Sequence, residues 1–321
     1  MVAADPPRQV APRAELFEPS TEQWRPHRWT AELGPALVVA LRRLLGSDPG
    51  DRPAHRYGVA WQGHFTPSGD AAGLSDFTAF RRGTYPALAR FSNLFRRHGA
   101  RDIKGMAVKL SPPDGEVTDL VAMSLEVFPV RRSTHFLSLL EALRKGPVRS
   151  VAALATMVAS RRLSPHALAL GVRTAATSRD ARYTTFHGVH TFWLVRRSPG
   201  DVQTERRPVR YRWVPDVPEG AGPVVGSSET DEIRFTLELQ LGNPAWPRVS
   251  DPTWRWPRRT PTVRAGRLIL DQVLQPEPAD LAFNPAVLAP GIEPGDDDVF
   301  SDRAGAYAVS QTWRLGHGDR R

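Results

Sequence analysis

Hydrophobic residues recur at every second position in several segments, which is the pattern of β-strands that bury one face. Between residues 56 and 66 this alternation predicts a strand whose core-facing side chains are Tyr57, Val59, Trp61 and Phe65. Further strands are predicted at residues 85–93, 102–111, 118–128, 185–196, 209–215, 232–241 and 263–273. So many strands with alternating faces predict an antiparallel barrel or sandwich.

Apolar positions spaced by three and four residues predict helices in two other parts of the chain. The first helix spans residues 32–46, with Thr30 as its N-cap and Gly46 at its end. Three more interrupt the strands as a helical insertion, at residues 133–146, where Ser133 is the expected cap, and near 149–160 and 164–174. We therefore predict an α+β protein, with an N-terminal arm and helix over residues 1–50 and one main domain over residues 51–321.

The chain after about residue 243 is rich in proline, so we expect a tail that wraps the body and delivers a final helix to it. In residues 301–316, spacings of four and eleven place Arg303, Tyr307 and Arg314 on one helix face. The residues between them are mostly Ala and Gly, which let a flat ligand approach the backbone. This face is a candidate surface for an anionic, planar or metal-containing ligand.

The formal net charge of +9 raises the question of nucleic-acid binding. The basic residues form scattered pairs without a long basic tract, and nearly all are Arg, so we expect no nucleic-acid partner. Because the chain has no Cys, disulfides, thiolate nucleophiles and Cys-bound metals are excluded. The N-terminus lacks the apolar core of a secretory signal, and the longest apolar run, VAALATMVAS, is too short to span a bilayer. We expect a cytoplasmic protein without a membrane span.

The pattern R-x-x-x-Y, followed seven residues later by R-L-G, resembles the haem-ligating helix of the catalase family. The preceding FNPAVLAPGIEP resembles the family's approach to that helix. The resemblance implies that Tyr307 ligates the haem iron and that Arg314 contacts a haem propionate. Arg303, one turn before Tyr307, is expected to favour the phenolate form that binds ferric iron.

Two more segments in the same order resemble the wall opposite that helix. DRPAHRYGVAWQGHF resembles the family's R-x-x-H segment, which implies that Arg52 contacts a haem carboxylate and that His55 is the distal histidine. Strand alternation places His55 on the apolar face, an unusual environment for an imidazole. PALARFSN resembles the V-R-F-S strand, which implies that Arg90 contacts a propionate and that Ser92 orients the distal histidine.

The segment DLVAMSLEVFPVRRSTHF resembles the family's D-L-V-G-N-N-x-P-x-F-F-x-R-D, and RDIKGMAVKL resembles R-D-x-R-G-F-A-x-K-F. Phe128 and Phe136 are then expected to line the haem pocket. Met123 and Ser124 stand where the family has two asparagines, the first of which is the distal amide that holds peroxide. Ser124 is a partial substitute if the strand is shifted, whereas Met123 makes the distal cavity more apolar.

The resemblance covers about residues 50–316, and the length is that of the small catalase-related peroxidases and allene-oxide-synthase-like proteins. It implies a haem b peroxidase that reduces organic hydroperoxides with a reducing co-substrate and has weak or no catalase activity. His55 would act as general base and then general acid. A homo-oligomer is a further expectation. The alternatives are a fatty-acid hydroperoxide isomerase or dehydratase, another haem-dependent biosynthetic enzyme, and a non-catalytic haem-binding protein.

Each candidate taken alone also has a plainer interpretation. His55 and Tyr307 could be structural core residues, and Arg303 could form a surface ion pair with the acidic stretch GDDDVFSD. His187 and His190 are three apart in one predicted strand, hence on opposite faces, so we expect no shared metal site and a structural role for His190. GAGPVVGSS lacks the strand-turn-helix context of a nucleotide-binding loop.

Overall fold

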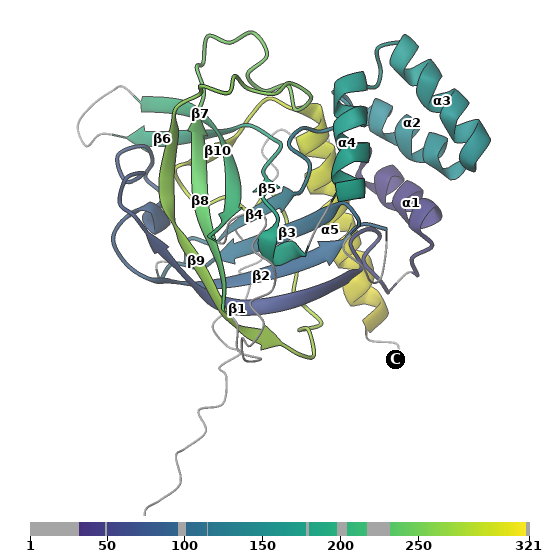
Figure 1. The fold of residues 1–321 in the computed structure, drawn as a ribbon. Helices are drawn as coiled ribbons and strands as arrows, with labels where there is room; N and C mark the ends of the chain where they lie inside the picture. Colours follow the sequence, from purple (N-terminus) through teal and green to yellow (C-terminus); the bar gives the residue numbers. More distant parts are fainter. Residues whose placement is uncertain are drawn as a thin grey trace, which may run out of the picture.

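The computed structural model describes residues 32–48, 50–95, 101–113, 115–177, 180–197, 204–216 and 232–318. Eight strands close into an antiparallel barrel, in the order β7-β5-β4-β3-β2-β1-β9-β8 and back to β7 (Figure 1). They are β1 (Tyr57–Pro67), β2 (Tyr85–Asn93), β3 (Lys104–Leu110), β4 (Thr118–Met123), β5 (Phe186–His187), β7 (Thr204–Pro215), β8 (Ile233–Leu241) and β9 (Thr262–Leu274). Outside the ring, β6 (Phe192–Arg197) pairs with β7 and with β10 (Ile292–Pro294). The predicted α+β barrel is confirmed.

Strand β1 shows both the strength and the limit of the alternation argument. Phe65 is fully buried inside the barrel and Trp61 packs against the same core, as predicted. Val59, however, is 40% exposed. On the opposite face Ala60 is fully buried, because the tail residues Leu281 and Phe283 cover it. The strand therefore buries parts of both faces, whereas the sequence predicts only one buried face.

Two other predicted strands are shorter in the structure. The strand predicted at 118–128 ends at Met123. The strand predicted at 185–196 breaks after His187, so His187 and His190 do not share a strand, and the predicted arrangement of the pair was wrong. Strand β10 was not predicted. The Gly-rich segment at 220–228 lies outside the described residues.

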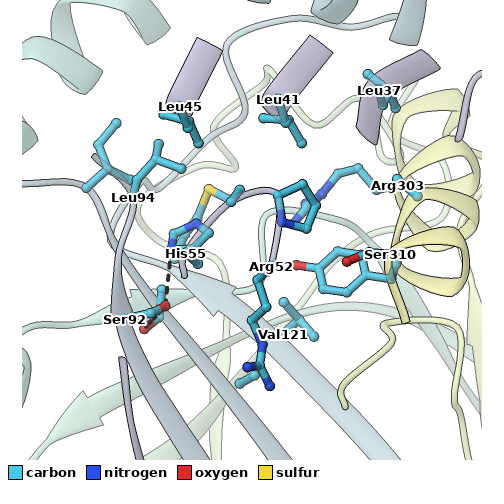
Figure 2. Close-up of a pocket in the computed structure, with 18 of the residues that line it drawn as sticks. Leu37, Leu41, Leu45, Arg52, His55, Ser92, Leu94, Val121, Arg303 and Ser310 are labelled. Carbon is cyan, nitrogen blue, oxygen red and sulfur yellow. Dashed lines mark hydrogen bonds between the residues drawn. The ribbon is translucent and has the colours of Figure 1, made fainter. Parts of the chain in front are cut away.

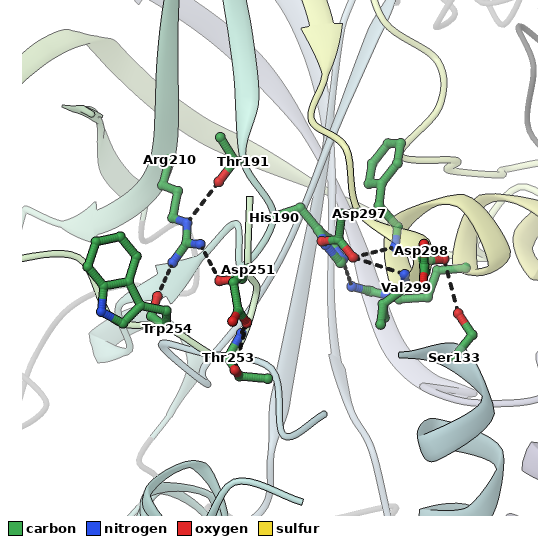
Figure 3. A network of polar contacts seen from close by, with 12 residues as sticks. Ser133, His190, Thr191, Arg210, Asp251, Thr253, Trp254, Asp297, Asp298 and Val299 are labelled. Atoms are coloured by element: carbon green, nitrogen blue, oxygen red, sulfur yellow. Dashed lines mark hydrogen bonds and ion pairs between the residues drawn. The ribbon is translucent and has the colours of Figure 1, made fainter. Parts of the chain in front are cut away.

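The helices agree closely with the predicted ones. Helix α1 (Gly34–Leu45) ends at Gly46, which adopts the left-handed conformation, whereas Thr30 lies outside the described residues. Between β4 and β5 the insertion contains α2 (Ser133–Arg144), α3 (Pro147–Ala159) and α4 (Pro165–Thr177). Short 3-10 turns occupy Thr78–Phe80 and Ala181–Tyr183. Ser133 is the first residue of α2 rather than its cap, and its hydroxyl donates to the Asp298 carbonyl (Figure 3).

The final helix, α5 (Asp298–Gly318), lies beside the barrel and packs against α1 and α2 (Figure 1). A Cβ added to Gly34 of α1 would lie 2.9 Å from the carbonyl carbon of Gly305. Gly305 is therefore used for close packing between two helices, and its predicted role in approaching a ligand was wrong. In the described ranges no helix is both long and apolar enough to cross a membrane.

Candidate functional site

A cavity of about 290 Å³ lies where the β2–β4 wall of the barrel meets α1, α2 and α5. Figure 2 shows Leu37, Leu41 and Leu45 of α1 in a row on one side of it, with His55 and Arg303 on the other. Most of its lining is apolar, which limits water around any bound group. Every residue predicted for the site borders this cavity: Arg52, His55, Arg90, Ser92, Met123, Phe128, Phe136, Arg303, Tyr307 and Arg314.

His55 stands just before β1, in a left-handed backbone conformation with φ of 56°. The position of its side chain thus does not follow from strand alternation, contrary to the prediction. Its Nδ1 lies 3.1 Å from the Ser92 hydroxyl oxygen (Figure 2). Burial, with smaller effects of the Arg90 and Arg303 charges, lowers the pKa of His55 to about 3. The imidazole is therefore neutral at physiological pH and available to accept a proton.

Arg90, itself only 5% exposed, explains how this backbone conformation is held. Its Nη1 donates to the His55 carbonyl at 2.8 Å and its Nη2 to the Arg56 carbonyl at 3.1 Å. Its Nε donates to the Glu277 carboxylate at 2.9 Å. A left-handed conformation in a non-glycine residue persists only where neighbouring groups fix it. Arg90 thus positions His55, and its predicted contact with a propionate stays a prediction.

Three guanidinium groups gather at one end of the cavity around a single carboxylate. Arg52 pairs with Glu277 at 2.7 Å, and Arg52 and Arg314 both donate to the Leu281 carbonyl, at 2.6 and 3.2 Å. Burial, then the charges of Arg90 and Arg314, lower the pKa of Arg52 to about 9, which Glu277 partly opposes. Within the described part of the chain, the buried Nε of Arg314 has no hydrogen-bond partner. The three positive charges outnumber the carboxylates near them, Glu277 and the exposed Asp280, so the cluster keeps a net positive charge that favours an anionic ligand.

On α5, Arg303 belongs to a second, separate polar chain. Its Nη1 lies 2.6 Å from Nε2 of His190, and Nδ1 of His190 lies 2.6 Å from Oδ2 of Asp297. Oδ1 of Asp297 accepts the Val299 N–H at the start of α5 (Figure 3). The acidic stretch thus reaches Arg303 through a buried histidine and does not form a surface ion pair with it. Arg303 also lies over the Phe128 ring, 5.4 Å from its centroid.

His190 has the structural role that the sequence predicts, because both ring nitrogens are engaged. Burial lowers the pKa of His190, which the Asp297 carboxylate opposes and the Arg303 charge reinforces. A neutral ring that donates from Nδ1 to Asp297 can accept from Arg303 at Nε2. This arrangement fixes the guanidinium one helical turn from Tyr307.

The distal wall has no amide at the position where the resemblance places one. Met123 borders the cavity there, as predicted. Ser124 does not substitute for an amide, because it does not border the cavity and its hydroxyl accepts the Lys104 backbone N–H at 3.0 Å, so that expectation was wrong. Asn93 faces Lys104, whose Nζ donates to its side-chain oxygen at 2.9 Å. Phe128 and Phe136 border the other side, with ring centroids 5.0 Å apart.

Three residues of the site were missed in the sequence. A Cβ added to Gly105 would lie 2.9 Å from both the His55 Nδ1 and the Ser92 oxygen, and one added to Gly58 would lie 2.7 Å from Nη1 of Arg90. A glycine inside a strand pattern is a signal for such close approach. Glu277 carries no such signal, because it lies 187 residues from Arg90 in a proline-rich tail.

Comparisons with known proteins agree with this geometry. The family model described as Catalase matches residues 49–217. A catalase-related peroxidase of Mycolicibacterium paratuberculosis is 32% identical over 87% of this chain and 94% of its own length. A second catalase-related peroxidase, from Synechococcus elongatus, is 24% identical over 87% of both chains.

Full-length catalases are longer than this chain. Catalase-3 of Arabidopsis thaliana is 27% identical over 83% of this chain but only 60% of its own length. The crystal structure of a fungal catalase has the same fold, with a TM-score of 0.69 and 20% identity, over 88% of this chain and 62% of the fungal chain. Taken with the family model and the M. paratuberculosis relative, these similarities show that the chain belongs to the catalase family, as a haem-dependent oxidoreductase that uses hydroperoxides.

Proposed function

We propose that this protein is a haem b peroxidase that reduces organic hydroperoxides and has little catalase activity. The observation that carries the proposal is the cavity itself, in which His55 and Tyr307 border the same space and a thioether occupies the amide position. A reducing co-substrate and a cytoplasmic location are parts of the proposal.

The residues present fit haem. Haem is flat and apolar with two propionates at one edge, and the cavity combines an apolar lining with an arginine cluster that keeps a net positive charge. The buried Nε of Arg314, without a partner among the described residues, offers a donor to such a carboxylate. Tyr307 is the ligand that we assign to the iron, since a phenolate is a recognised proximal ligand.

A bound haem would supply the iron at which the O–O bond breaks and the site that stores the oxidising equivalents. With haem bound, His55 would move the proton: its neutral imidazole accepts a proton from the terminal oxygen of the hydroperoxide and returns it to the oxygen that carries the organic group, which leaves as an alcohol. Ser92 fixes the orientation and tautomer of His55. Two electrons and two protons from the co-substrate complete the reduction of one hydroperoxide to an alcohol and water.

Replacement of Tyr307 by Phe tests the cofactor assignment. We expect the variant to lose most haem binding, because Phe has no oxygen ligand for iron, and haemin titration followed by visible absorbance measures it. Tyr183→Phe, outside the cavity, is the control and should bind like the parent. Equal haem affinity and an unchanged spectrum in Tyr307→Phe would disprove the assignment.

Replacement of Met123 by Asn tests the preference for organic hydroperoxides. An amide restored beside His55 can hydrogen-bond a second peroxide, so oxygen release from hydrogen peroxide should rise roughly tenfold, the effect of one good hydrogen bond. Oxygen-electrode assays measure it. If oxygen release does not change, Met123 does not set the low catalase activity.

An isomerase or dehydratase acting on fatty-acid hydroperoxides is the second candidate, favoured by the apolar lining of the cavity. Such an enzyme needs no reductant, because the substrate is rearranged rather than reduced. Product analysis with a lipid hydroperoxide distinguishes them: alcohol formed only with co-substrate supports the peroxidase, and a ketol or epoxide formed without it supports the alternative.

A further inference from the structure

We propose that the helical insertion α2–α4 docks on an anionic lipid bilayer and that the cavity takes its hydroperoxide from that bilayer. The inference rests on the proposed function for its substrate, and it adds the surface from which the substrate arrives. Figure 1 shows the insertion projecting from the barrel, with α3 at its outer side.

The outer face of α3 is apolar where a surface helix is ordinarily polar. Its exposed positions follow helical spacing, and five of the seven are Val or Ala: Val148, Val151, Ala152, Ala155 and Ala159. The other two are Arg149 and Thr156. Val148 is 84% exposed and Val151 is 68% exposed. On α4, Val172 is 64% exposed. These three are the most exposed large hydrophobic side chains among the described residues, so the insertion concentrates apolar surface that no described part of the chain covers.

From the end of α2 onward, the charges of the insertion have one sign. From residue 142 to residue 177 the sequence contains six Arg or Lys residues and no Asp or Glu. They are Arg144, Lys145, Arg149, Arg161, Arg162 and Arg173, and all six are exposed. One of them, Arg144, pairs with Glu141 of α2 at 3.1 Å. Apolar residues flanked by basic ones on a helix surface are the features that bind the interface of an anionic membrane.

This charge distribution also favours a membrane over a second copy of the chain. Two copies joined through this face would bring two uniformly basic surfaces together, which like-charge repulsion opposes. An anionic bilayer, by contrast, attracts the basic residues and accepts the valines among its acyl chains.

The cavity is continuous with this insertion. Leu143, near the end of α2, borders the cavity and is 37% exposed, and Val148 follows five residues later. Phe95, after β2, also borders the cavity and is 49% exposed. Two exposed apolar side chains thus stand at the cavity's edge, so an apolar hydroperoxide could pass from the bilayer into the cavity without crossing bulk water.

Vesicle flotation with the full-length, haem-loaded protein tests the surface. The probes are vesicles of phosphatidylcholine alone and vesicles of equal parts phosphatidylcholine and phosphatidylglycerol. We expect binding to the anionic vesicles only, weakened in about 1 M salt, where the Debye length is about 3 Å. Each basic residue near an anionic surface contributes roughly fivefold in partitioning, so Arg161→Glu with Arg162→Glu should reduce binding by at least tenfold.

Arg258→Glu with Arg259→Glu is the matched control, because these arginines form an exposed adjacent pair that is not part of α2–α4, and it should bind like the parent. Val148→Ser with Val151→Ser tests the apolar contribution without changing charge, and thermal unfolding checks that each variant is folded. Equal binding to both kinds of vesicle, equal loss in the two arginine pairs, or no binding at all would overturn the proposal. So would a dimer that Val148→Ser with Val151→Ser abolishes and that does not bind vesicles.

The activity readout separates this inference from the proposed function. With a small water-soluble organic hydroperoxide, Arg161→Glu with Arg162→Glu should turn over like the parent. With a phospholipid hydroperoxide in anionic vesicles it should be at least tenfold slower. If vesicles bind but no hydroperoxide is reduced, the docking surface stands and the proposed function fails. If the protein reduces hydroperoxide but does not bind vesicles, the proposed function stands and the docking surface fails.

Discussion

Two histidines at the site, His55 and His190, have the same ring in different surroundings, since His190 is buried and His55 is half-buried. His190 lies between Asp297 and Arg303 with both nitrogens engaged, and it is absent from the cavity lining. His55 borders the cavity, and the only hydrogen bond of its imidazole found among the described residues is the one with the Ser92 hydroxyl. An imidazole with a free nitrogen facing a cavity can move a proton, whereas one with both nitrogens engaged can only hold its neighbours in place.

The charges around the two rings explain the difference further. Both arginines that act on His55 disfavour its protonated form, and no carboxylate of the described residues compensates for them. At His190 the Asp297 carboxylate partly offsets the effect of burial. The chain therefore keeps a weakly basic, neutral imidazole where the proposed mechanism passes a proton, and a strongly hydrogen-bonded imidazole where Arg303 is held in place.

Matched replacements by Gln should separate these two roles most strongly. His55→Gln should keep haem and fold but slow the hydroperoxide-dependent spectral change by about 10³-fold, within the usual range for loss of a general acid–base. His190→Gln should leave that step within about tenfold but destabilise the protein by about 3 kcal/mol, because it breaks a buried hydrogen-bonded chain.

Stopped-flow absorbance measures the rate, and urea unfolding measures the stability. His64→Gln, a histidine of β1 that does not border the cavity, is the control for both. If the two variants show the same loss of rate and the same loss of stability, the two histidines do not have different roles.

Glu277→Gln should have the next largest effect, and it tests whether the position of His55 depends on the arginine cluster. Removing the charge weakens the ion pairs that Glu277 forms with Arg52 and with the buried Arg90, so we expect a loss of about 2 kcal/mol in the free energy of unfolding. Glu232→Gln, which removes one partner of an exposed pair with Arg234, should leave the free energy of unfolding nearly unchanged. Equal costs in the two variants would show that Glu277 does not hold the cluster.

Much of the fold could be predicted because alternation along strands such as β8 reflects their burial directly, although β2 is buried at five consecutive positions, 87–91. Strand β10 could not be predicted, since three residues are too few to show an alternating pattern. The exposure of Val59 and the burial of Ala60 depend on where the tail lies, which is a long-range property. Local periodicity indicates which face of a strand is apolar, but it does not indicate whether a distant segment of the chain covers the other face.

The candidate site was likewise predictable only in part. Helical spacing predicted that Arg303, Tyr307 and Arg314 share a face, and all three border the cavity. Strand alternation did not explain His55, because its place depends on a left-handed backbone held by Arg90. Nor could spacing pair Glu277 with Arg90, since tertiary structure alone brings the two together.

The pH dependence of the reaction should show the smallest effect, and it sharpens the contrast between the two histidines. Because the pKa of His55 is lowered to about 3, the ring is neutral, and able to accept a proton, at every pH above about 4. The rate constant of the hydroperoxide-dependent spectral change should thus stay nearly constant from pH 8 to pH 5 and fall only as pH approaches 3.

An ordinary histidine makes the opposite prediction in the same range. With a pKa of about 6.5, only about 3% of the ring would be neutral at pH 5, so the rate constant would fall roughly thirtyfold between pH 8 and pH 5. Stopped-flow measurements in that range distinguish the two cases, provided that haem occupancy is checked at each pH. A thirtyfold fall would mean that His55 has water or a carboxylate near it in the working enzyme, and that its isolation from compensating charge, on which the contrast with His190 depends, is lost.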